Sequence, residues 1–395
     1  MMATRQIDET EDFSLVLGGP LYQLFLRSGL VKPPFGNLRW RIAVITAIAW
    51  FPLIPLTLLS SRFAGGVHVP FLYDFEVHSR LLVALPLMII AELIVYVRMR
   101  AIASQFVERH IVTDELLPAF KGVISSAMRL RNSISVEVAL FVLVVFAGPW
   151  MWRETVALRS DTWYATVTSS GAAYTAAGQW YGFVSVPVFQ LILLRWYYRI
   201  FIWCRMMFQV ARLDLNLLPT HPDRCCGLGF LGNIASAFAP LLMAHSALIA
   251  GFIANRIMYE GATLPDYKVE LVAMAALLLA IVLGPLCVFT PKLNRARLAG
   301  LRTYGRLASD YVAGFAHKWT EGSGTPCEPL LGSADIQSLA DLDNSFAIVK
   351  EMRLAPFGKE TVIRFVLFIA LPLAPLALTM FSLEELVRRL LGVLL

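Results

Sequence analysis

Seven apolar segments of about 20 residues recur along this chain of 395 residues, and they limit its folds more than any other feature. They cover residues 41–60, 81–98, 135–152, 181–204, 233–255, 270–291 and 361–381. An α-helix needs roughly 20 residues to cross the apolar core of a bilayer. Hydrophobic residues make up 57% of the chain and charged residues 16%, against about 45–50% and about 25% in soluble domains. The sequence therefore predicts an all-α, polytopic membrane bundle of about seven transmembrane helices.

Lysine and arginine are divided unevenly between the two sides of this bundle. With the N-terminus inside, the segments 1–41, 98–131, 205–224 and 292–364 hold 24 of the 34 basic residues. The opposite side holds 8, and Arg195 and Arg199 lie within a span. Because cytoplasmic segments carry the excess of Lys and Arg, we predict an N-inside, C-outside topology.

The same pattern divides the chain into four parts. Residues 1–40 form a cytoplasmic N-terminal segment. Residues 41–291 hold spans 1–6, with a helical insert at 99–134 and an outer loop at 153–180. Residues 292–360 form a cytoplasmic helical insert, and 361–395 form the last span and an amphipathic C-terminal helix.

Two of these connecting parts allow more specific predictions. In the insert, apolar residues at helical spacing predict one amphipathic helix over 293–319, lying on headgroups or packing on its neighbours. A second helix follows, capped by Ser333 or Asp335. In the outer loop, "TWYATV" and "AAYTAAGQWY" flank "SSG". This pattern fits a small hairpin, but aromatic residues such as Trp163 and Tyr181 as interfacial anchors are the simpler interpretation.

Four polar residues lie within the predicted spans: Glu92, Arg195, Arg199 and His245. Charged groups in a bilayer are costly, so each is a candidate functional residue. One interpretation is structural: Glu92 pairs with Arg195 or Arg199, or Arg199 extends to the inner headgroups. The other is an intramembrane polar pathway, in which the arginines attract an anion and Glu92 or His245 relays protons.

The stretch "LLPTHPDRCCGLGFLG" (217–232) joins two spans and collects residues that could bind a metal. His221, Asp223, Cys225 and Cys226 have suitable side chains, but adjacent cysteines suit one tetrahedral zinc ion poorly. Asp223 can instead accept hydrogen bonds from nearby backbone N–H groups. Gly227 and Gly229 let the chain bend closely. We therefore predict an elbow loop formed by His221, Asp223, Gly227 and Gly229, with no metal and no cofactor.

Three stretches carry a resemblance to a known family: "HPDRCCGLGFLG", "SADIQSLADLDNSF" and "PLAPLALTMFSLEEL". They resemble a family of bacterial polytopic inner-membrane proteins of unknown function, whose loop between spans reads His-Pro-Asp-x-x-Gly-Gly-Leu. Cys226 stands where the first of those glycines would be. The resemblance covers most of the chain and implies a multi-pass protein of the bacterial inner (plasma) membrane. It implies no activity.

Two functions of different class follow from these features. The first is a channel or secondary transporter for a small anion or protons, using Glu92, Arg195, Arg199 and His245. The alternative is a non-transporting scaffold or signalling component that docks a partner through residues 293–352. An enzyme ranks third, because no span carries a metal pair, a Ser-His arrangement or a paired-carboxylate motif. The predicted partners are the lipid bilayer and either a second copy or a membrane or cytoplasmic protein; no nucleic-acid motif is present.

Overall fold

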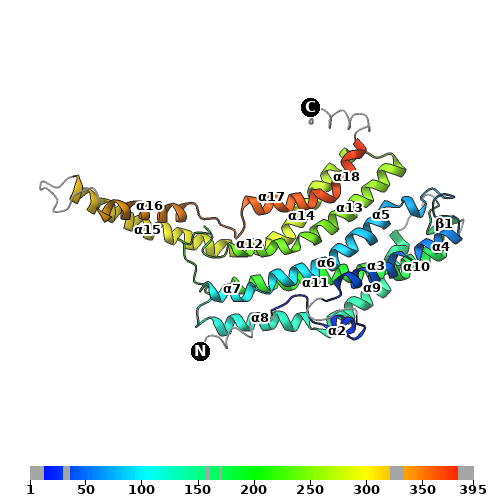
Figure 1. Ribbon diagram of the computed structural model, residues 1–395, viewed down its shortest axis with the longest axis horizontal. Coiled ribbons are helices and arrows are strands. Elements are labelled where there is room, and N and C mark those ends of the chain that lie inside the picture. The colour runs from blue at the N-terminus through cyan, green and yellow to red at the C-terminus, as the bar shows by residue number, and fades with distance from the viewer. Residues whose placement is uncertain (1–12, 30–35, 156–160, 169–170, 321–332, 381–395) are drawn as a thin grey trace.

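Long apolar helices run along the length of the molecule, because a helix satisfies its own backbone hydrogen bonds where no water is available. The computed structural model describes residues 13–29, 36–155, 161–168, 171–320 and 333–380. It shows an elongated bundle with a two-helix arm at one end (Figure 1). Among the described residues, six helical stretches are long and apolar enough to cross a membrane: Leu38–Leu59, Phe75–Glu108, Ala176–Val210, Phe230–Glu260, Leu264–Trp319 and Lys359–Ala377. This confirms a mostly helical bundle with apolar helices of membrane-spanning length, while seven spans and the N-inside, C-outside topology stay predictions.

These stretches are built from shorter elements. The first two contain α3 (Leu38–Trp50), α4 (Leu53–Leu59), α5 (Phe75–His78), η2 (Ser79–Ala84), α6 (Leu85–Met99) and α7 (Ile102–Glu108). The next two contain α10 (Ala176–Trp180), η3 (Tyr181–Ser185), α11 (Val186–Val210), α12 (Phe230–Ala235), η4 (Ser236–Phe238) and α13 (Ala239–Glu260). The last two contain η5 (Leu264–Tyr267), α14 (Lys268–Leu283), η6 (Gly284–Phe289), α15 (Thr290–Trp319), α17 (Lys359–Ala370), η7 (Leu371–Leu373) and α18 (Ala374–Ala377).

The remaining predicted span, 135–152, lies within α9 (Ile134–Thr155), a helix of 22 residues. It follows α8 (Leu117–Arg131), which with α7 accounts for most of the predicted helical insert 99–134. In the N-terminal segment, α2 (Pro20–Arg27) is described. The C-terminal amphipathic helix was predicted largely within 381–395, which lies outside the described residues.

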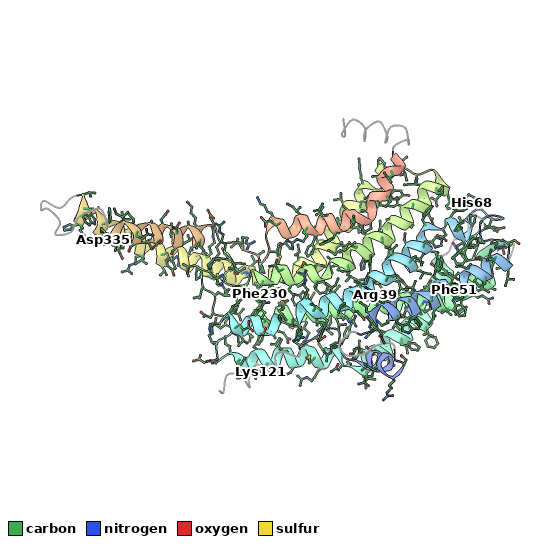
Figure 2. All side chains as sticks on the ribbon, viewed as in Figure 1. Arg39, Phe51, His68, Lys121, Phe230 and Asp335 are labelled. Carbon is green, nitrogen blue, oxygen red and sulfur yellow. The ribbon has the colours of Figure 1, made fainter. Side chains whose placement is uncertain are left out.

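Hydrogen bonds between distant segments define the two ends of the bundle. At the elbow end, Asn216 N donates to Ile111 O at 2.9 Å, and Arg353 Nη2 donates to Asp223 O at 2.8 Å. At the other end, which we call the β-hairpin end, Arg62 Nη1 donates to Thr162 O at 2.9 Å. Figure 2 shows the same division: Lys121 and Phe230 are labelled toward one end, and Phe51 and His68 at the other.

The predicted outer loop forms the hairpin, and the structure buries Trp163 and Tyr181. Strands β1 (Ala165–Thr168) and β2 (Gly171–Tyr174) pair antiparallel, with Ala165 opposite Tyr174. The Trp163 side chain is fully buried, and its Nε1 donates to Asp74 Oδ2 at 2.8 Å. The interfacial-anchor interpretation is wrong for Trp163 and Tyr181, because both rings pack inside the protein.

Two spans widen into a π-helix near the β-hairpin end. η2 and η3 each precede a proline, Pro86 and Pro187, at the second residue of the following helix. Proline has no N–H to donate to the carbonyl four residues earlier, so a regular α-helical turn cannot be completed there. The Arg80 guanidinium in η2 donates to the Tyr181 hydroxyl in η3, which joins the two wide turns.

The arm is the part of the predicted cytoplasmic insert that lies beyond the bundle. α14, η6 and α15 follow one another within a single helical stretch of 56 residues, so the predicted helix 293–319 continues the preceding span. α16 (Ala334–Lys350) packs along α15 (Figure 1). Ser333 Oγ accepts from Asp335 N at 3.1 Å, which makes Ser333, not Asp335, the cap of α16. Asp335 lies at the far end of the arm (Figure 2).

Candidate functional site

Three charged side chains from three spans meet inside the bundle. Arg199 Nη1 on α11 lies 2.7 Å from Glu92 Oε1 on α6, and Arg41 Nη2 on α3 lies 2.6 Å from Glu92 Oε2. All three residues are buried, with Arg41 only 2% exposed. One carboxylate therefore links two guanidinium groups and holds three helices together.

This arrangement resolves the predicted pairing of Glu92. Its partner among the two predicted arginines is Arg199, so the extension of Arg199 to the headgroups is wrong. The charge pattern of the sequence groups Arg41 with the cytoplasmic charges, because it stands at the border of an apolar segment. The structure corrects this: Arg41 is the fourth residue of the helical stretch and lies on its buried face with Ile45 and Ala49. The spacing 41, 45, 49 was visible in the sequence and could have shown that Arg41 faces the core.

Arg195 pairs with a residue that the sequence reasoning missed. Its Nη2 lies 3.2 Å from Oε1 of Glu137 on α9. Glu137 falls at the start of the predicted span 135–152, where its position inside the apolar segment was the available signal. We call Arg41, Glu92, Glu137, Arg195 and Arg199 the charge cluster. It contains three arginines and two glutamates.

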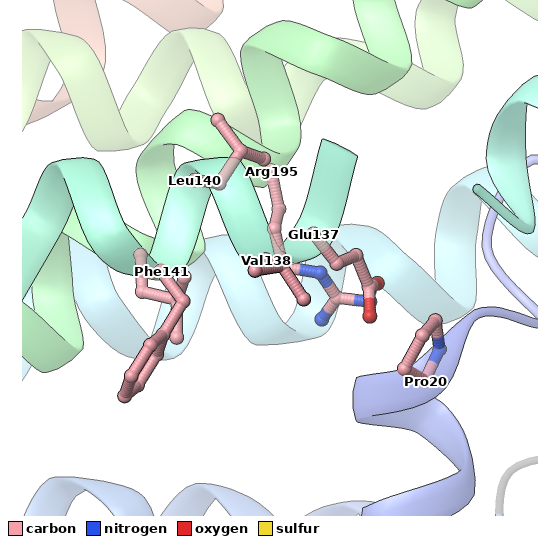
Figure 3. Close-up of a pocket in the computed structure, with 7 residues that line it drawn as sticks. Pro20, Glu137, Val138, Leu140, Phe141 and Arg195 are labelled. Atoms are coloured by element: carbon pink, nitrogen blue, oxygen red, sulfur yellow. The ribbon is translucent and has the colours of Figure 1, made fainter. Parts of the chain in front are cut away.

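A cavity of about 230 Å³ lies against the Arg195–Glu137 pair. Its remaining lining is apolar, and comes from Pro20, Val138, Leu140, Phe141 and Leu191. Figure 3 shows Arg195 and Glu137 beside each other, with Pro20 of α2 at one side and Phe141 at the other. Val138 and Phe141 are each more than half exposed, so this cavity is a groove in the flank of the bundle.

His245 lies apart from the charge cluster and makes two hydrogen bonds. Its Nδ1 lies 2.7 Å from Leu241 O, and its Nε2 lies 2.9 Å from the Tyr197 hydroxyl. Since the carbonyl can only accept, Nδ1 donates to Leu241 O, and Nε2 shares the second hydrogen bond with the Tyr197 hydroxyl. The imidazole so placed links α13 to α11.

The elbow is built around the Asp223 carboxylate. Oδ1 accepts from the N–H groups of Cys225 (2.8 Å) and Gly227 (3.1 Å), and Oδ2 accepts from Gly229 N (2.9 Å). Arg224, Cys226 and Gly227 have positive φ angles of 54°, 54° and 89°. Burial alone would raise the pKa of Asp223, but the hydrogen bonds from Gly229, Gly227 and Cys225 outweigh it and hold the pKa below its usual value. His221 Nδ1 lies 2.8 Å from Oδ1.

The two elbow cysteines face the segment after α16. Cys225 Sγ donates to Ala355 O at 3.4 Å, and Cys226 Sγ lies 3.4 Å from the sulfur of Met352. Burial raises the pKa of each thiol to about 12. Both are therefore protonated near neutral pH, which is unfavourable for a metal ligand or a nucleophile. Within the described ranges, no three His, Cys, Asp or Glu side chains come together as a metal-binding group.

A second buried polar cluster at the β-hairpin end was not predicted. Asp74 is 3% exposed, and its Oδ1 accepts from Asn255 Nδ2 at 2.8 Å while Oδ2 accepts from Trp163 Nε1. Its Oδ1 also accepts from Val77 N at 3.2 Å, which caps α5. Asp74 and Trp163 come from two separate connections between spans, and Asn255 comes from α13. Local sequence patterns therefore carry no signal of their meeting.

Comparison with known proteins adds no relative: the sequence matches no family model, no curated protein and no solved structure.

Proposed function

We propose that the protein is a seven-span integral protein of the bacterial inner membrane with its elbow end in the cytoplasm. Six apolar helices and the 22-residue α9 are consistent with seven crossings. The excess of Lys and Arg in the segments at the elbow end favours this orientation. The bacterial membrane is inferred from the sequence resemblance alone.

Within that membrane, we propose that the protein is a non-transporting scaffold or signalling component whose arm docks a cytoplasmic protein. The observation that carries this proposal is the continuation of one span into the arm. α15 has 30 residues, which corresponds to about 45 Å of helix at 1.5 Å per residue. A helix of that length, directed away from the bundle, places its far end well beyond the headgroups.

The two helices of the arm carry many charged residues and bury few side chains. Among the residues of α15, six are Lys or Arg and one is Asp, whereas α16 has three Asp and one Lys. The two helices bury only three of their residues: Leu293, Gly300 and Val349. Arg302 and Arg306 are exposed, and so is Leu307, at 49%. A basic, mostly solvated surface of this kind suits a partner with an acidic surface.

The base of the arm is fixed to the bundle, which favours transmission of a contact over a loose tether. A Cβ at Gly300 would lie 2.7 Å from Pro219 Cβ, so the elbow packs directly on α15. Arg353 N donates to Arg224 O at 2.7 Å, and Arg224 pairs with Glu351 at 2.8 Å.

Site-specific photocrosslinking in cells tests this proposal. A photoreactive amino acid replaces Leu307 on the arm in the full-length protein, and Leu277, 60% exposed on α14, is the matched control. We expect an adduct with a soluble protein from position 307 only, weakened several-fold by Arg302→Glu with Arg306→Glu. The absence of a position-307 adduct, or one that is unchanged by charge reversal, would contradict the docking role.

A channel or transporter for a small anion or protons is the second candidate. The specific observation in its favour is that the same two helical stretches meet twice. Glu92 on α6 pairs with Arg199 on α11, and Arg80 in η2 contacts Tyr181 in η3. π-helices within a span are frequent at functional sites. Against it, each predicted pathway residue is held by a partner. Proteoliposome flux that is selective for one ion and is lost in Arg195→Ala would favour transport; the docking proposal expects no flux in either protein.

A further inference from the structure

The groove beside Arg195 has a charged end and an apolar end, arranged as the headgroup and acyl chains of a membrane lipid are. Glu137 is the fourth residue of α9, so the Arg195–Glu137 pair lies near the end of that helix that faces the elbow. Leu140 and Phe141 lie about one turn further along α9. Leu191 lies one turn from Arg195 on α11, in the direction of the β-hairpin end. Charge is therefore placed toward one membrane surface and apolar lining toward the middle of the bilayer.

The charge cluster has one more arginine than glutamate. Arg41, Arg195 and Arg199 face Glu92 and Glu137, and Arg195 is the arginine that lines the groove. Arg131 adds a further guanidinium in a smaller cavity that Arg195, Arg199 and Glu137 also line. Surplus charge at low dielectric is costly unless an opposite charge compensates it. A single phosphodiester at the groove would balance the five residues of the charge cluster.

With α9 crossing the membrane, as the proposed seven-span topology has it, the open side of the groove faces the bilayer. Val138 and Phe141 are exposed, and so are Val142, Val145 and Phe146 of the same helix. Such an apolar helix surface in a membrane contacts acyl chains. The occupant that fits these observations has an apolar chain and one negative charge at its end.

We propose that this groove binds one anionic phospholipid, with its phosphate on Arg195 and an acyl chain along Val138, Phe141 and Leu191. Glu137 keeps its contact with Nη2 of Arg195, and the phosphate oxygens accept hydrogen bonds from the N–H groups on the open side of the guanidinium. The site is independent of the arm and of any flux.

Lipid titration of the purified full-length protein, read by native mass spectrometry, tests this site. The probes are phosphatidylglycerol and phosphatidylcholine with identical acyl chains. Both lipids carry the phosphodiester, but the cationic choline of phosphatidylcholine offsets its charge. The surplus arginine is therefore expected to give the anionic lipid a preference of about tenfold. Val138→Trp fills the groove without touching the charges and should weaken phosphatidylglycerol binding by about tenfold. Val272→Trp on the exposed face of α14 is the control and should leave it unchanged.

Two further arms separate the alternatives. Arg195→Gln should remove the preference for phosphatidylglycerol; if this variant does not fold, Val138→Trp still decides. Glycerol phosphate should not displace the lipid, since it lacks the acyl chain. Equal binding of the two lipids, binding unaffected by Val138→Trp, or displacement by glycerol phosphate would each overturn the proposal.

Discussion

Glu92 is the residue whose loss should cost the bundle most. In Glu92→Gln, the guanidinium groups of Arg41 and Arg199 lose their shared carboxylate while they remain buried. Removing one partner of a buried pair costs about 3–5 kcal/mol. We expect a large fall in the melting temperature of the detergent-solubilised protein.

The control for this prediction is Glu260→Gln. Glu260 pairs with Arg256 one turn away at 2.5 Å, and both side chains are substantially exposed. Exposed pairs contribute about 0–1 kcal/mol, so this variant should melt close to the wild type. Equal melting temperatures for the two variants would show that the charge cluster does not stabilise the fold.

The Asp223 carboxylate should make the stability of the protein depend on pH in the acid range. Its pKa is held below the usual value by the N–H groups of the elbow. A carboxylate with a lowered pKa adds stability at pH values above its unfolded pKa of about 3.9. That contribution is lost as the pH falls through the folded-state pKa. Asp223→Asn should therefore melt lower than the wild type at pH 7, with a smaller gap below pH 4.

The exposed Asp343 on α16 provides the comparison for Asp223. Asp343→Asn should follow the wild type at both pH values. A gap between wild type and Asp223→Asn that stays constant from pH 7 to below pH 4 would contradict the role given to the carboxylate.

At the scale of elements, two glycines should respond to alanine in opposite directions. A Cβ at Gly251 on α13 would lie 2.7 Å from the backbone oxygen of Phe75 and 2.6 Å from Ser79. Small residues let membrane helices approach closely, so Gly251→Ala should separate α13 from α5 and η2. A Cβ at Gly314 on α15 meets nothing within 4 Å. There alanine should stabilise the helix by about 0.5–1 kcal/mol.

Melting curves and hydrogen exchange measure both changes. Gly251→Ala should lower the melting temperature and speed amide exchange in α5, whereas Gly314→Ala should slow exchange in α15. Unchanged exchange in α5 would indicate that the close approach of these helices is not important for stability.

The sequence predicted these elements where hydropathy governs them. Six of the seven predicted segments overlap the six candidate spans, because burial in lipid demands an apolar run of defined length. Amphipathic spacing predicted the helix over 293–319, but not that it continues the preceding span as α15 does, since continuity across a polar boundary has no hydropathy signal. The sequence did not predict the π-helices either, because they depend on the contact between Arg80 and Tyr181 as well as on Pro86 and Pro187.

The candidate site was predictable only in part for a related reason. Glu92 and Arg199 stand out because charge is rare within a span. Arg41 and Glu137 lie near the ends of their segments, where charge is ordinary and attracts no notice. Which charges meet depends on how α3, α6, α9 and α11 pack, and that arrangement is a property of the whole bundle.

At the scale of the whole molecule, the contacts of the elbow constrain how often the chain crosses the membrane. Asn216 is hydrogen-bonded to Ile111, and Arg353 is hydrogen-bonded to Asp223. The segments around these four residues therefore lie together at the elbow end. Thr162 bonds to Arg62 at the other end. The chain must therefore pass from one end to the other between Ile111 and Thr162, and α8 and α9 are the helices that lie between them.

Protease sites inserted singly into the full-length protein test this topology. We expect sites within 113–116 and 321–329 to be cut only in inverted membrane vesicles, and a site at Ala262 only in right-side-out vesicles. An even number of crossings, with α9 outside the membrane, would place the first two sites on opposite sides. Melting temperatures near that of the wild type would show that the insertions leave the bundle intact. Cleavage of the 113–116 and 321–329 sites from different sides would exclude seven crossings, and it would also require the elbow contacts with Ile111 and Arg353 to be broken in the membrane.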